Sequence, residues 1–235
     1  MPLPKRRTEK SAETRRRILD ASIELFIKNG YEKTTTRQII QKAGILNGSL
    51  YNLFEGKDQI FSDVMMEALW DSIEESEKYM PKNIPFVDVV SFPICLLVYA
   101  SSRSQRVAEL FATSNRIWEI NKRVCESMID WITEKDVNHT LPTETEDFRI
   151  RIYACMGAVG NIIERFEKEP GCMSDRDAIN VLAEILVNAF GLSTMNLKER
   201  VDSVYTIVST HDLVICGMHV VPQSDGIGIE PVGGA

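Results

Sequence analysis

Hydrophobic residues recur along most of this chain at the spacing of an α-helix. They stand three or four residues apart, which places them on one face of each helical segment. Residues that start or end helices separate these segments. The pattern predicts an all-α protein with about nine or ten helices.

Three helices are predicted near the amino terminus, and the second and third are short. The first follows Ser11, a residue type that caps helices. Thr35 and Gln38 have the spacing of a capping box, so a second helix begins there, and Gly44 ends it. A third helix is predicted over about 47–54. Short helices joined by a glycine turn are typical of a helix-turn-helix unit.

Longer helical patterns fill the middle of the chain. The first runs over 57–79, and Pro81 follows its end. A capping box that begins at Thr143 precedes a second long helix, and the pair Ser174 and Asp177 marks the start of a third. The remaining predicted helices cover about 86–102, 104–116, 117–134, 144–168, 175–191 and 197–208. From His211 onward the helical pattern fails, and either a short strand at 213–215 or 218–221, or a tail, fits the composition.

Charge is divided unevenly along the chain. Residues 1–57 carry 12 Lys and Arg against 6 Asp and Glu, a net charge of +6, whereas the remaining residues carry 15 against 28, a net charge of −13. A basic unit in an acidic chain indicates a polyanionic partner such as nucleic acid. The expected parts are a basic tail (1–10), a DNA-binding domain (11–56), a helical domain (57–209) and a C-terminal tail (210–235).

The helix-turn-helix segment carries side chains suited to DNA. Hydroxyl groups and an arginine at the start of the second helix can contact phosphate, and polar groups on the third helix can approach base edges. Apolar residues of the segment pack the helices together, namely Ile39, Ala43, Ile45, Leu50 and Phe54. The residues expected to contact double-stranded DNA are Thr34, Thr35, Thr36, Arg37, Leu46, Asn47, Gly48, Ser49, Tyr51, Asn52 and Lys57.

Residues 12–72, with the motif at about 35–54, resemble the TetR family of transcriptional regulators. The resemblance rests on an ordered set of residues, which are Leu25, Phe26, Gly30, Tyr31, Thr34, Thr35, Ile39, Ala43, Gly44, Ile45, Gly48, Tyr51, Phe54, Lys57 and Asp58. It implies a repressor that binds a palindromic operator as a dimer and is released by a small-molecule effector. It also implies an N-terminal helix-turn-helix domain followed by a C-terminal domain for ligand binding and dimerisation.

Three residues depart from the family pattern. Leu46 stands where a serine is usual, so Asn47 is expected to cap the third helix instead. Leu53 replaces a usual His or Tyr and removes one possible phosphate contact, and Ile40 replaces a usual Ala. These departures leave an alternative open, a helical ligand-binding or protein-interaction module whose helix-turn-helix no longer reads DNA.

The resemblance also implies a homodimer built from the last two long helices, 144–168 and 175–191. Small residues between the apolar ones, such as Gly157 and Gly160, allow a partner helix to come close. The expected interface residues are Ile152, Met156, Val159, Ile163, Phe166, Ile179, Leu182, Leu186 and Phe190. Burial within one subunit is the alternative for these side chains.

An effector pocket among the middle helices is implied as well. Aromatic and sulfur-containing side chains can line such a cavity. The expected lining residues are Trp70, Tyr99, Phe111, Trp118, Met128 and Trp131. Ordinary core packing is the alternative, and nothing in the sequence specifies the effector.

No residue pattern indicates catalysis. The three histidines, His139, His211 and His219, lie near predicted loops or the tail, outside any catalytic or metal-binding spacing. We therefore expect a protein that is not an enzyme and has no metal or cofactor. Five scattered cysteines fit free thiols in a reducing cytoplasm. The amino terminus lacks a signal-peptide core, and the longest uncharged run, 89–102, is too short to span a bilayer, so no membrane association is expected.

Overall fold

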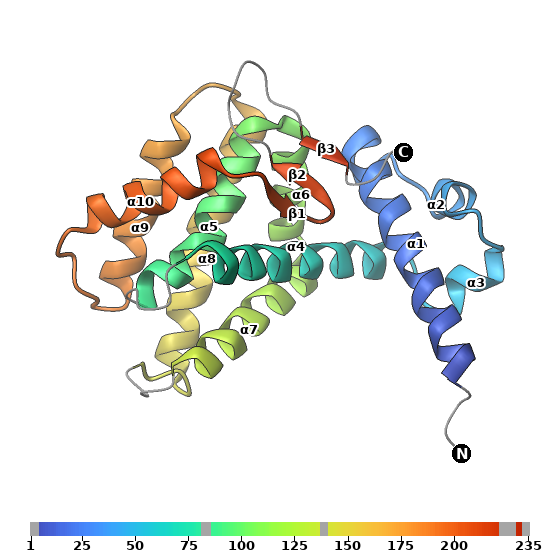
Figure 1. Ribbon diagram of the computed structural model, residues 1–235, viewed down its shortest axis with the longest axis horizontal. Helices are drawn as coiled ribbons and strands as arrows, with labels where there is room; N and C mark the ends of the chain where they lie inside the picture. The colour runs from blue at the N-terminus through green and yellow to red at the C-terminus, as the bar shows by residue number, and fades with distance from the viewer. Residues whose placement is uncertain (1–4, 81–85, 137–140, 221–228, 232–235) are drawn as a thin grey trace.

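The computed structural model describes residues 5–80, 86–136, 141–220 and 229–231. Within them the chain forms ten α-helices and three short β-strands (Figure 1). The helices are α1 (Lys5–Asn29), α2 (Thr36–Ala43), α3 (Asn47–Tyr51), α4 (Lys57–Tyr79), α5 (Phe86–Arg103), α6 (Gln105–Arg116), α7 (Trp118–Lys135), α8 (Glu146–Lys168), α9 (Asp175–Ala189) and α10 (Leu197–Thr210). The strands are β1 (Leu213–Ile215), β2 (Met218–Val220) and β3 (Ile229–Pro231). This architecture confirms the predicted helical class and adds a small sheet.

The first three helices form a small unit at one end of the molecule (Figure 1). Its centre is aromatic: the Phe26 and Phe61 rings meet edge to face at 5.4 Å, and the Tyr31 ring stacks on Phe61 at 4.3 Å. Leu50 and Phe54 are buried beneath α3, as predicted. The predicted cap at Ser11 is wrong, because α1 begins at Lys5 and runs through that residue.

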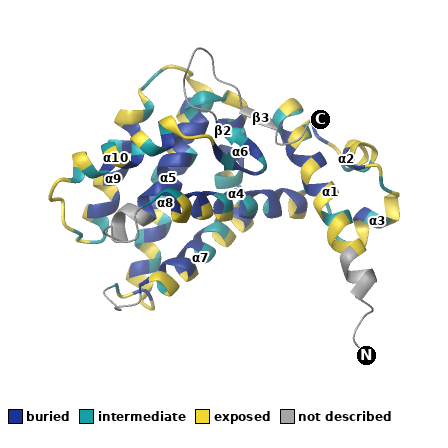
Figure 2. Cartoon of the chain, in the orientation of Figure 1, coloured by how far each residue is buried: buried dark blue, intermediate teal, exposed yellow. Residues whose placement is uncertain are grey.

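Helix α4 joins the amino-terminal unit to the rest of the protein. It extends from the α1–α3 unit across the body of the molecule (Figure 1). Its side chains are buried along nearly its whole length, with Phe61 in the amino-terminal unit and Leu69 and Ile73 in the larger helical domain (Figure 2). Helix α4 therefore contributes side chains to the cores of both parts of the molecule.

Helices α5 to α10 build the larger domain, with boundaries close to those predicted. Helix α5 continues through Pro93. Ser174 caps α9 as expected, since its side chain accepts a hydrogen bond from the Asp177 amide. The predicted cap of α8 at Thr143 is wrong: Thr145 occupies that position and accepts from the Phe148 amide at 3.2 Å.

The segment after α10 folds into a β-hairpin, so both of the short segments considered as strands are strands. β1 pairs antiparallel with β2, and Leu213 lies opposite Val220. Cys216 and Gly217 form a two-residue turn with φ values of 52° and 65°. Positive φ at both positions is the geometry of a tight hairpin turn. β2 also pairs with β3, and Val221 of the expected 218–221 strand lies outside the described residues.

The tip of this hairpin is held against α4. The Cys216 amide donates a hydrogen bond to the Asp71 carboxylate at 2.7 Å, and its thiol donates to the Val64 carbonyl at 3.2 Å. Cys216 is buried, and burial raises the pKa of its thiol well above the ordinary value, so the thiol stays protonated. A β-hairpin therefore supports the middle of α4 (Figure 1).

Candidate nucleic-acid interface and ligand cavity

Helix α2 is fixed at both ends by the residues that the sequence indicated. The Gln38 amide donates to the Thr35 hydroxyl at 3.3 Å, and the Thr35 amide donates to the Gln38 side-chain oxygen at 2.8 Å, which completes the capping box. Gly44 ends the helix in the left-handed conformation, with φ of 62°. Arg17 of α1 donates to the Ala43 carbonyl at 2.5 Å and so fastens this end to the core.

Helix α3 is shorter than predicted, since it ends at Tyr51 rather than at Phe54. Backbone hydrogen bonds from Leu53 and Phe54 to the Leu50 carbonyl, both 2.9 Å, continue the turn. Leu46 occupies the capping position, but its side chain makes no cap hydrogen bond. The expectation that Asn47 caps the helix is therefore wrong.

The outer surface of this unit carries most of the residues expected to contact DNA. Tyr51 is 58% exposed and Leu46 is 80% exposed. The space beside Gly48 is open, since a Cβ atom added to this glycine would meet no described atom within 4 Å. The other exposed members of the set are Thr35, Arg37, Asn47 and Asn52, while Thr36 and Ser49 are half-buried. These residues come from the start of α2 and from α3, and most of them are accessible from outside the unit.

Two residues of the expected set are engaged within the protein. Thr34 is 1% exposed, and its hydroxyl donates to the Gly30 carbonyl at 2.8 Å, so it secures the turn between α1 and α2 and is inaccessible to phosphate. Lys57 donates from Nζ to the Tyr31 carbonyl at 2.9 Å and lies 4.1 Å from the centre of the Tyr31 ring. Its ammonium group is thus held against Tyr31, and a phosphate contact would use its remaining N–H donors or replace these partners.

The positive charge of the amino-terminal segment is partly neutralised inside the fold. Arg15 pairs with Asp63 and Arg16 pairs with Glu67 at 2.6 Å, and both carboxylates lie outside residues 1–57. The net charge of +6 therefore overstates the charge that faces outward, and the exposed Arg37 gains importance as a phosphate ligand.

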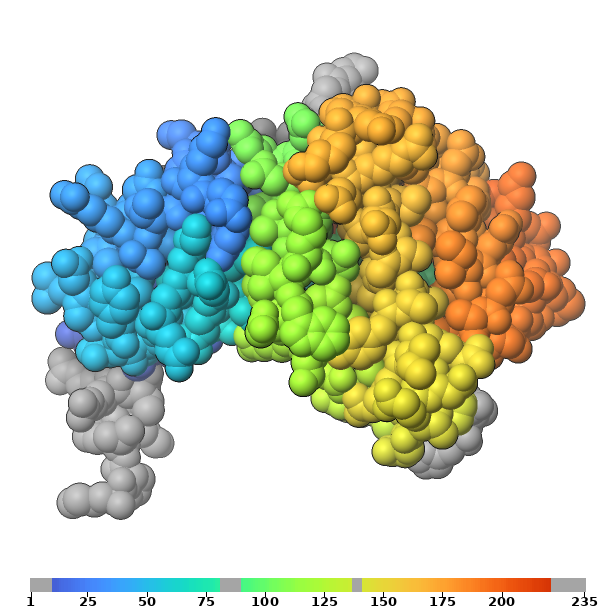
Figure 3. Space-filling model, turned by 180° about the vertical axis from the view of Figure 1, so that it is seen from behind, coloured from blue at the N-terminus to red at the C-terminus, as the bar shows by residue number. Residues whose placement is uncertain are grey.

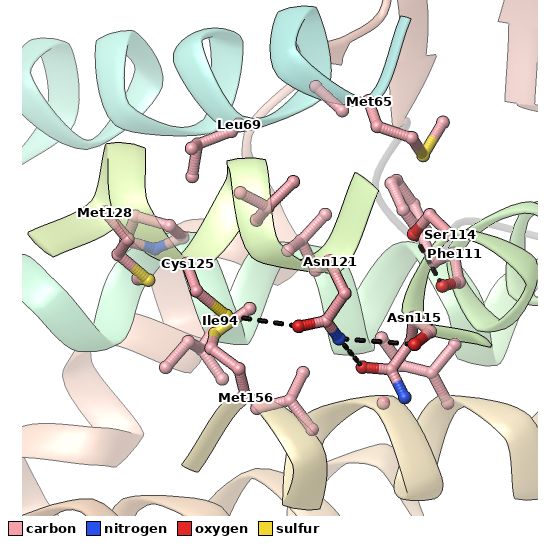
Figure 4. A pocket seen from close by; sticks show the side chains of 17 residues that line it. Met65, Leu69, Ile94, Phe111, Ser114, Asn115, Asn121, Cys125, Met128 and Met156 are labelled. Carbon is pink, nitrogen blue, oxygen red and sulfur yellow. Dashed lines mark hydrogen bonds between the residues drawn. The ribbon is translucent and has the colours of Figure 1, made fainter. Parts of the chain in front are cut away.

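A second candidate site is a cavity of about 60 Å³ enclosed by α4, α5, α6, α7 and α8. Methionine side chains from three helices form much of its wall, namely Met65, Met128 and Met156 (Figure 4). Methionine is flexible and fills irregular space, so these walls can yield to a larger molecule. A cavity of about 150 Å³ holds benzene, so a ring-sized ligand requires such a movement.

Three polar side chains that line this cavity are joined in a series by hydrogen bonds. The Cys125 thiol donates to the Asn121 side-chain oxygen at 3.3 Å, and the Asn121 amide nitrogen donates to the Asn115 side-chain oxygen at 2.6 Å (Figure 4). Burial raises the pKa of the Cys125 thiol to about 12, which keeps it a donor. Asn115 packs against Gly160, where an added Cβ would lie 2.2 Å from its side chain. None of the described residues that line the cavity is charged.

The predicted pocket residues separate into three groups. Phe111 and Met128 line the cavity, as expected. Trp70 and Trp118 are 45% and 61% exposed and lie outside it. Tyr99 and Trp131 are buried in the core but not in the cavity wall, and the Tyr99 hydroxyl and Trp131 Nε1 have no hydrogen-bond partner among the described residues. The cavity is also lined by Asn115 and Asn121, which were not predicted and whose only signal in the sequence is their place at the junction of two amphipathic helices.

Most of the predicted dimer residues pack inside the protomer. Seven of them are at most 5% exposed, namely Ile152, Val159, Ile163, Phe166, Ile179, Leu182 and Leu186, and Met156 and Phe190 are half-buried. The stripes chosen from the sequence are therefore the inward faces of α8 and α9. On the outward faces, Ile150, Val181 and Ile185 are 60%, 50% and 40% exposed. In the rear view, α8 and α9 form a continuous surface (Figure 3).

Asp63 of α4 links the amino-terminal unit to α7, a helix that lines the cavity. It is 9% exposed and accepts hydrogen bonds from Arg15 of α1 and from Arg123 of α7, the latter at 2.6 Å. Arg123 lies between the cavity residues Asn121 and Cys125 in the sequence. One carboxylate thus bonds both to α1 of the amino-terminal unit and to α7, one of the helices that line the cavity.

Other chemistry is sparse in the described part of the chain. No three His, Cys, Asp or Glu side chains there form a group that could hold a metal ion. His219 pairs with Asp212 at 2.9 Å, and the five cysteines are free thiols. None of the described helices is both long and apolar enough for a bilayer crossing.

Comparison with known proteins agrees with the geometry. A profile of the family described as "Bacterial regulatory proteins, tetR family" matches residues 18–64, which are the core of the α1–α4 unit. The regulator QacR of Staphylococcus aureus is 23% identical over 189 residues, which is 79% of this chain and 89% of QacR. A probable acrEF/envCD operon repressor of Escherichia coli is 22% identical over 190 residues, 80% of this chain and 77% of that protein.

The fold as a whole is also shared with solved structures. The crystal structure of RolR in complex with resorcinol superposes with a TM-score of 0.63 over 83% of this chain and 95% of RolR, at 18% identity. At that identity the similarity describes the fold alone. It includes the helical domain beyond the matched profile.

Proposed function

Because the chain belongs to the TetR family of transcriptional regulators, we propose that it is a dimeric repressor that binds a palindromic operator and is released by a small-molecule effector. It acts where the chromosome lies, in the cytoplasm. The observation that carries the proposal is the exposed surface around α3, supported by the capping box at Thr35 and the left-handed Gly44. No observation favours the alternative of a helix-turn-helix that has lost DNA binding.

The operator contacts divide between phosphate and base. Arg37 and Tyr51, both exposed at the edges of the unit, bind phosphates and fix its position. Asn47 and Asn52 flank the open backbone at Gly48 and face base edges in the major groove. A groove about 12 Å wide admits this short helix.

Dimerisation uses the outward faces of α8 and α9. Ile150, Val181 and Ile185 are exposed apolar side chains on two adjacent helices, and a two-fold pairing would bury them. The amino-terminal units of the two protomers, here called the reading units, would then be related by a two-fold axis, which matches a palindromic operator. Val181→Glu is therefore expected to produce monomers with weak operator binding, while Glu184→Gln, a change at an exposed polar neighbour, leaves the dimer intact.

The effector is an uncharged, mainly apolar molecule that carries at least one hydrogen-bonding group. The described lining residues are all uncharged, and burial of an unpaired ion in such a site is strongly unfavourable. Asn115 and Asn121 supply the polar contact. RolR was crystallised with resorcinol, a small neutral aromatic compound of this kind.

Release follows from the contacts of Asp63. An effector that displaces α7 changes the position of Arg123, and Asp63 passes that change to Arg15. α4 lies between these partners, so the spacing of the two reading units changes with it. A ligand shifts this equilibrium only by its difference in affinity for the two arrangements.

Selection of bound duplexes from a random pool tests the proposal. A palindromic consensus is expected, with binding that weakens as salt rises. Arg37→Ala should reduce the salt slope by about 0.9 for each lost phosphate contact in the dimer. Lys198→Ala removes an exposed charge from α10 and serves as the matched control. Failure to enrich any duplex would refute the proposed function.

A further inference from the structure

Leu46 is an apolar side chain on a surface made otherwise of polar groups. It is 80% exposed, the highest value among the large exposed hydrophobic residues of the described chain. Its neighbours Asn47 and Gly48 are also exposed. Isolated surface leucines are common and need no explanation, so exposure alone assigns nothing to this residue.

The position of Leu46 gives its exposure meaning. It is the residue that begins α3, and its extended backbone (φ −82°, ψ 150°) directs the chain into the helix. Ser, Thr, Asp or Asn at such a position would cap the helix with a side-chain hydrogen bond, and Leu46 makes none. Neither the core nor the helix end is stabilised by this side chain.

The leading end of a recognition helix is the part that contacts base edges. Leu46 and Asn47 occupy that end, and the open space around Gly48 allows the backbone to approach the groove floor. The base edges of the major groove present hydrogen-bonding groups and one apolar group, the 5-methyl of thymine. A leucine can form a favourable contact there only with that methyl group.

We propose that Leu46 reads the 5-methyl group of a thymine in each half-site of the operator. This inference rests on the proposed function and names one element of the sequence that the protein recognises. A phosphate contact would leave the apolar side chain against charged oxygens, without the apolar burial that favours the methyl. Asn47 then recognises a neighbouring base by hydrogen bonding.

Thymine and uracil differ only by this methyl group, so the test needs no change in hydrogen bonding. Each thymine of the selected operator is replaced in turn by deoxyuridine, and Kd is measured for the full-length protein. At one position of the half-site, deoxyuridine should raise Kd about fourfold when one half-site is changed, and about 15-fold when both half-sites are changed. In Leu46→Ala, deoxyuridine at the same position should have no further effect.

Met195→Ala is the matched control, because Met195 is 75% exposed in the loop before α10, away from the reading surface. This variant should keep the full response to deoxyuridine. Leu46 is too exposed for its truncation to disturb the core, and a thermal melt verifies this.

The outcomes separate the two proposals. A protein that binds its operator but is insensitive to deoxyuridine at every position overturns the role of Leu46 and leaves the proposed function standing. A methyl effect that persists in Leu46→Ala assigns the contact to another residue and also overturns it. A protein that selects no duplex refutes the proposed function, and the role of Leu46 falls with it.

Discussion

Replacing Asp71 with asparagine tests how the β-hairpin is held against α4. Asp71 accepts a hydrogen bond from the Cys216 amide at 2.7 Å, and Glu67 is a neighbouring carboxylate on the same helix. Burial, and then the charge of Glu67, raise the pKa of Asp71 to about 6 from its ordinary 3.8, although the hairpin amides and Arg16 act in the opposite direction. The hairpin is therefore anchored to a carboxylate whose charge is unfavourable at neutral pH.

The direction in which pH changes the free energy of unfolding follows from proton binding. The folded protein holds a proton on Asp71 more tightly than the unfolded chain does, so this group stabilises the fold below about pH 4 and that contribution is lost as the pH rises through about 6. A shift of about two units corresponds to an upper limit of about 3 kcal/mol. Because the carboxyl is partly exposed, solvent screening reduces the expected effect to about 1 kcal/mol.

Asparagine keeps a side-chain oxygen for the Cys216 amide and removes the titration. Urea unfolding at one protein concentration, followed by circular dichroism, gives the free energies of unfolding of both proteins. Asp71→Asn should gain about 1 kcal/mol over the natural chain between about pH 4 and pH 7. Asp130→Asn, which removes an exposed carboxylate from α7, controls for loss of one negative charge. A difference between Asp71→Asn and the natural chain that is constant with pH would refute the reasoning.

Three further tests have definite expectations. Gly44→Ala should lower the free energy of unfolding in urea by about 1–2 kcal/mol, because the φ of 62° at this position disfavours a side chain. Gly48→Ala, in open space, should raise the free energy of unfolding by up to about 1 kcal/mol while weakening operator binding. Equal changes in the free energy of unfolding for the two variants would contradict this expectation. Thr35→Ala should lower the free energy of unfolding by about 1 kcal/mol through loss of the α2 cap, seen as a lower Tm; an unchanged Tm would argue against the cap. A double-mutant cycle of Asp63→Ala with Arg123→Ala should show a coupling of about 1 kcal/mol in unfolding and a reduced response of operator binding to effector; additive effects would exclude the contact.

Local signals in the sequence predicted the reading unit well. The Thr35 capping box and the terminal Gly44 act within a few residues, so spacing alone locates them. The start of α1 was misplaced because Ser11 is compatible with a helix interior as well as with a cap. The role of Thr34 could not be read from its neighbours, since its burial depends on how α1 and α2 pack.

The helices of the larger domain were predicted from the sequence, but the direction in which their apolar faces point was not. Periodicity identifies an apolar stripe on α8, but it does not say whether Ile152 and Val159 face their own subunit or a partner. The less regular outward residues, such as Ile150, gave no periodic signal. Asn115 and Asn121 became a site only through contact between helices, which no local pattern records.

The hairpin also has a consequence for the order in which the protein folds. Asp71 and Cys216 are 145 residues apart along the chain, and the contact between Val64 and Cys216 spans 152 residues. Closing a long loop costs more entropy than closing a short one, and contacts between distant residues slow folding. The capping box of α2, in contrast, joins residues three positions apart. We therefore expect the α2 cap to form early from local contacts, and the support that holds α4 to be among the last parts to form.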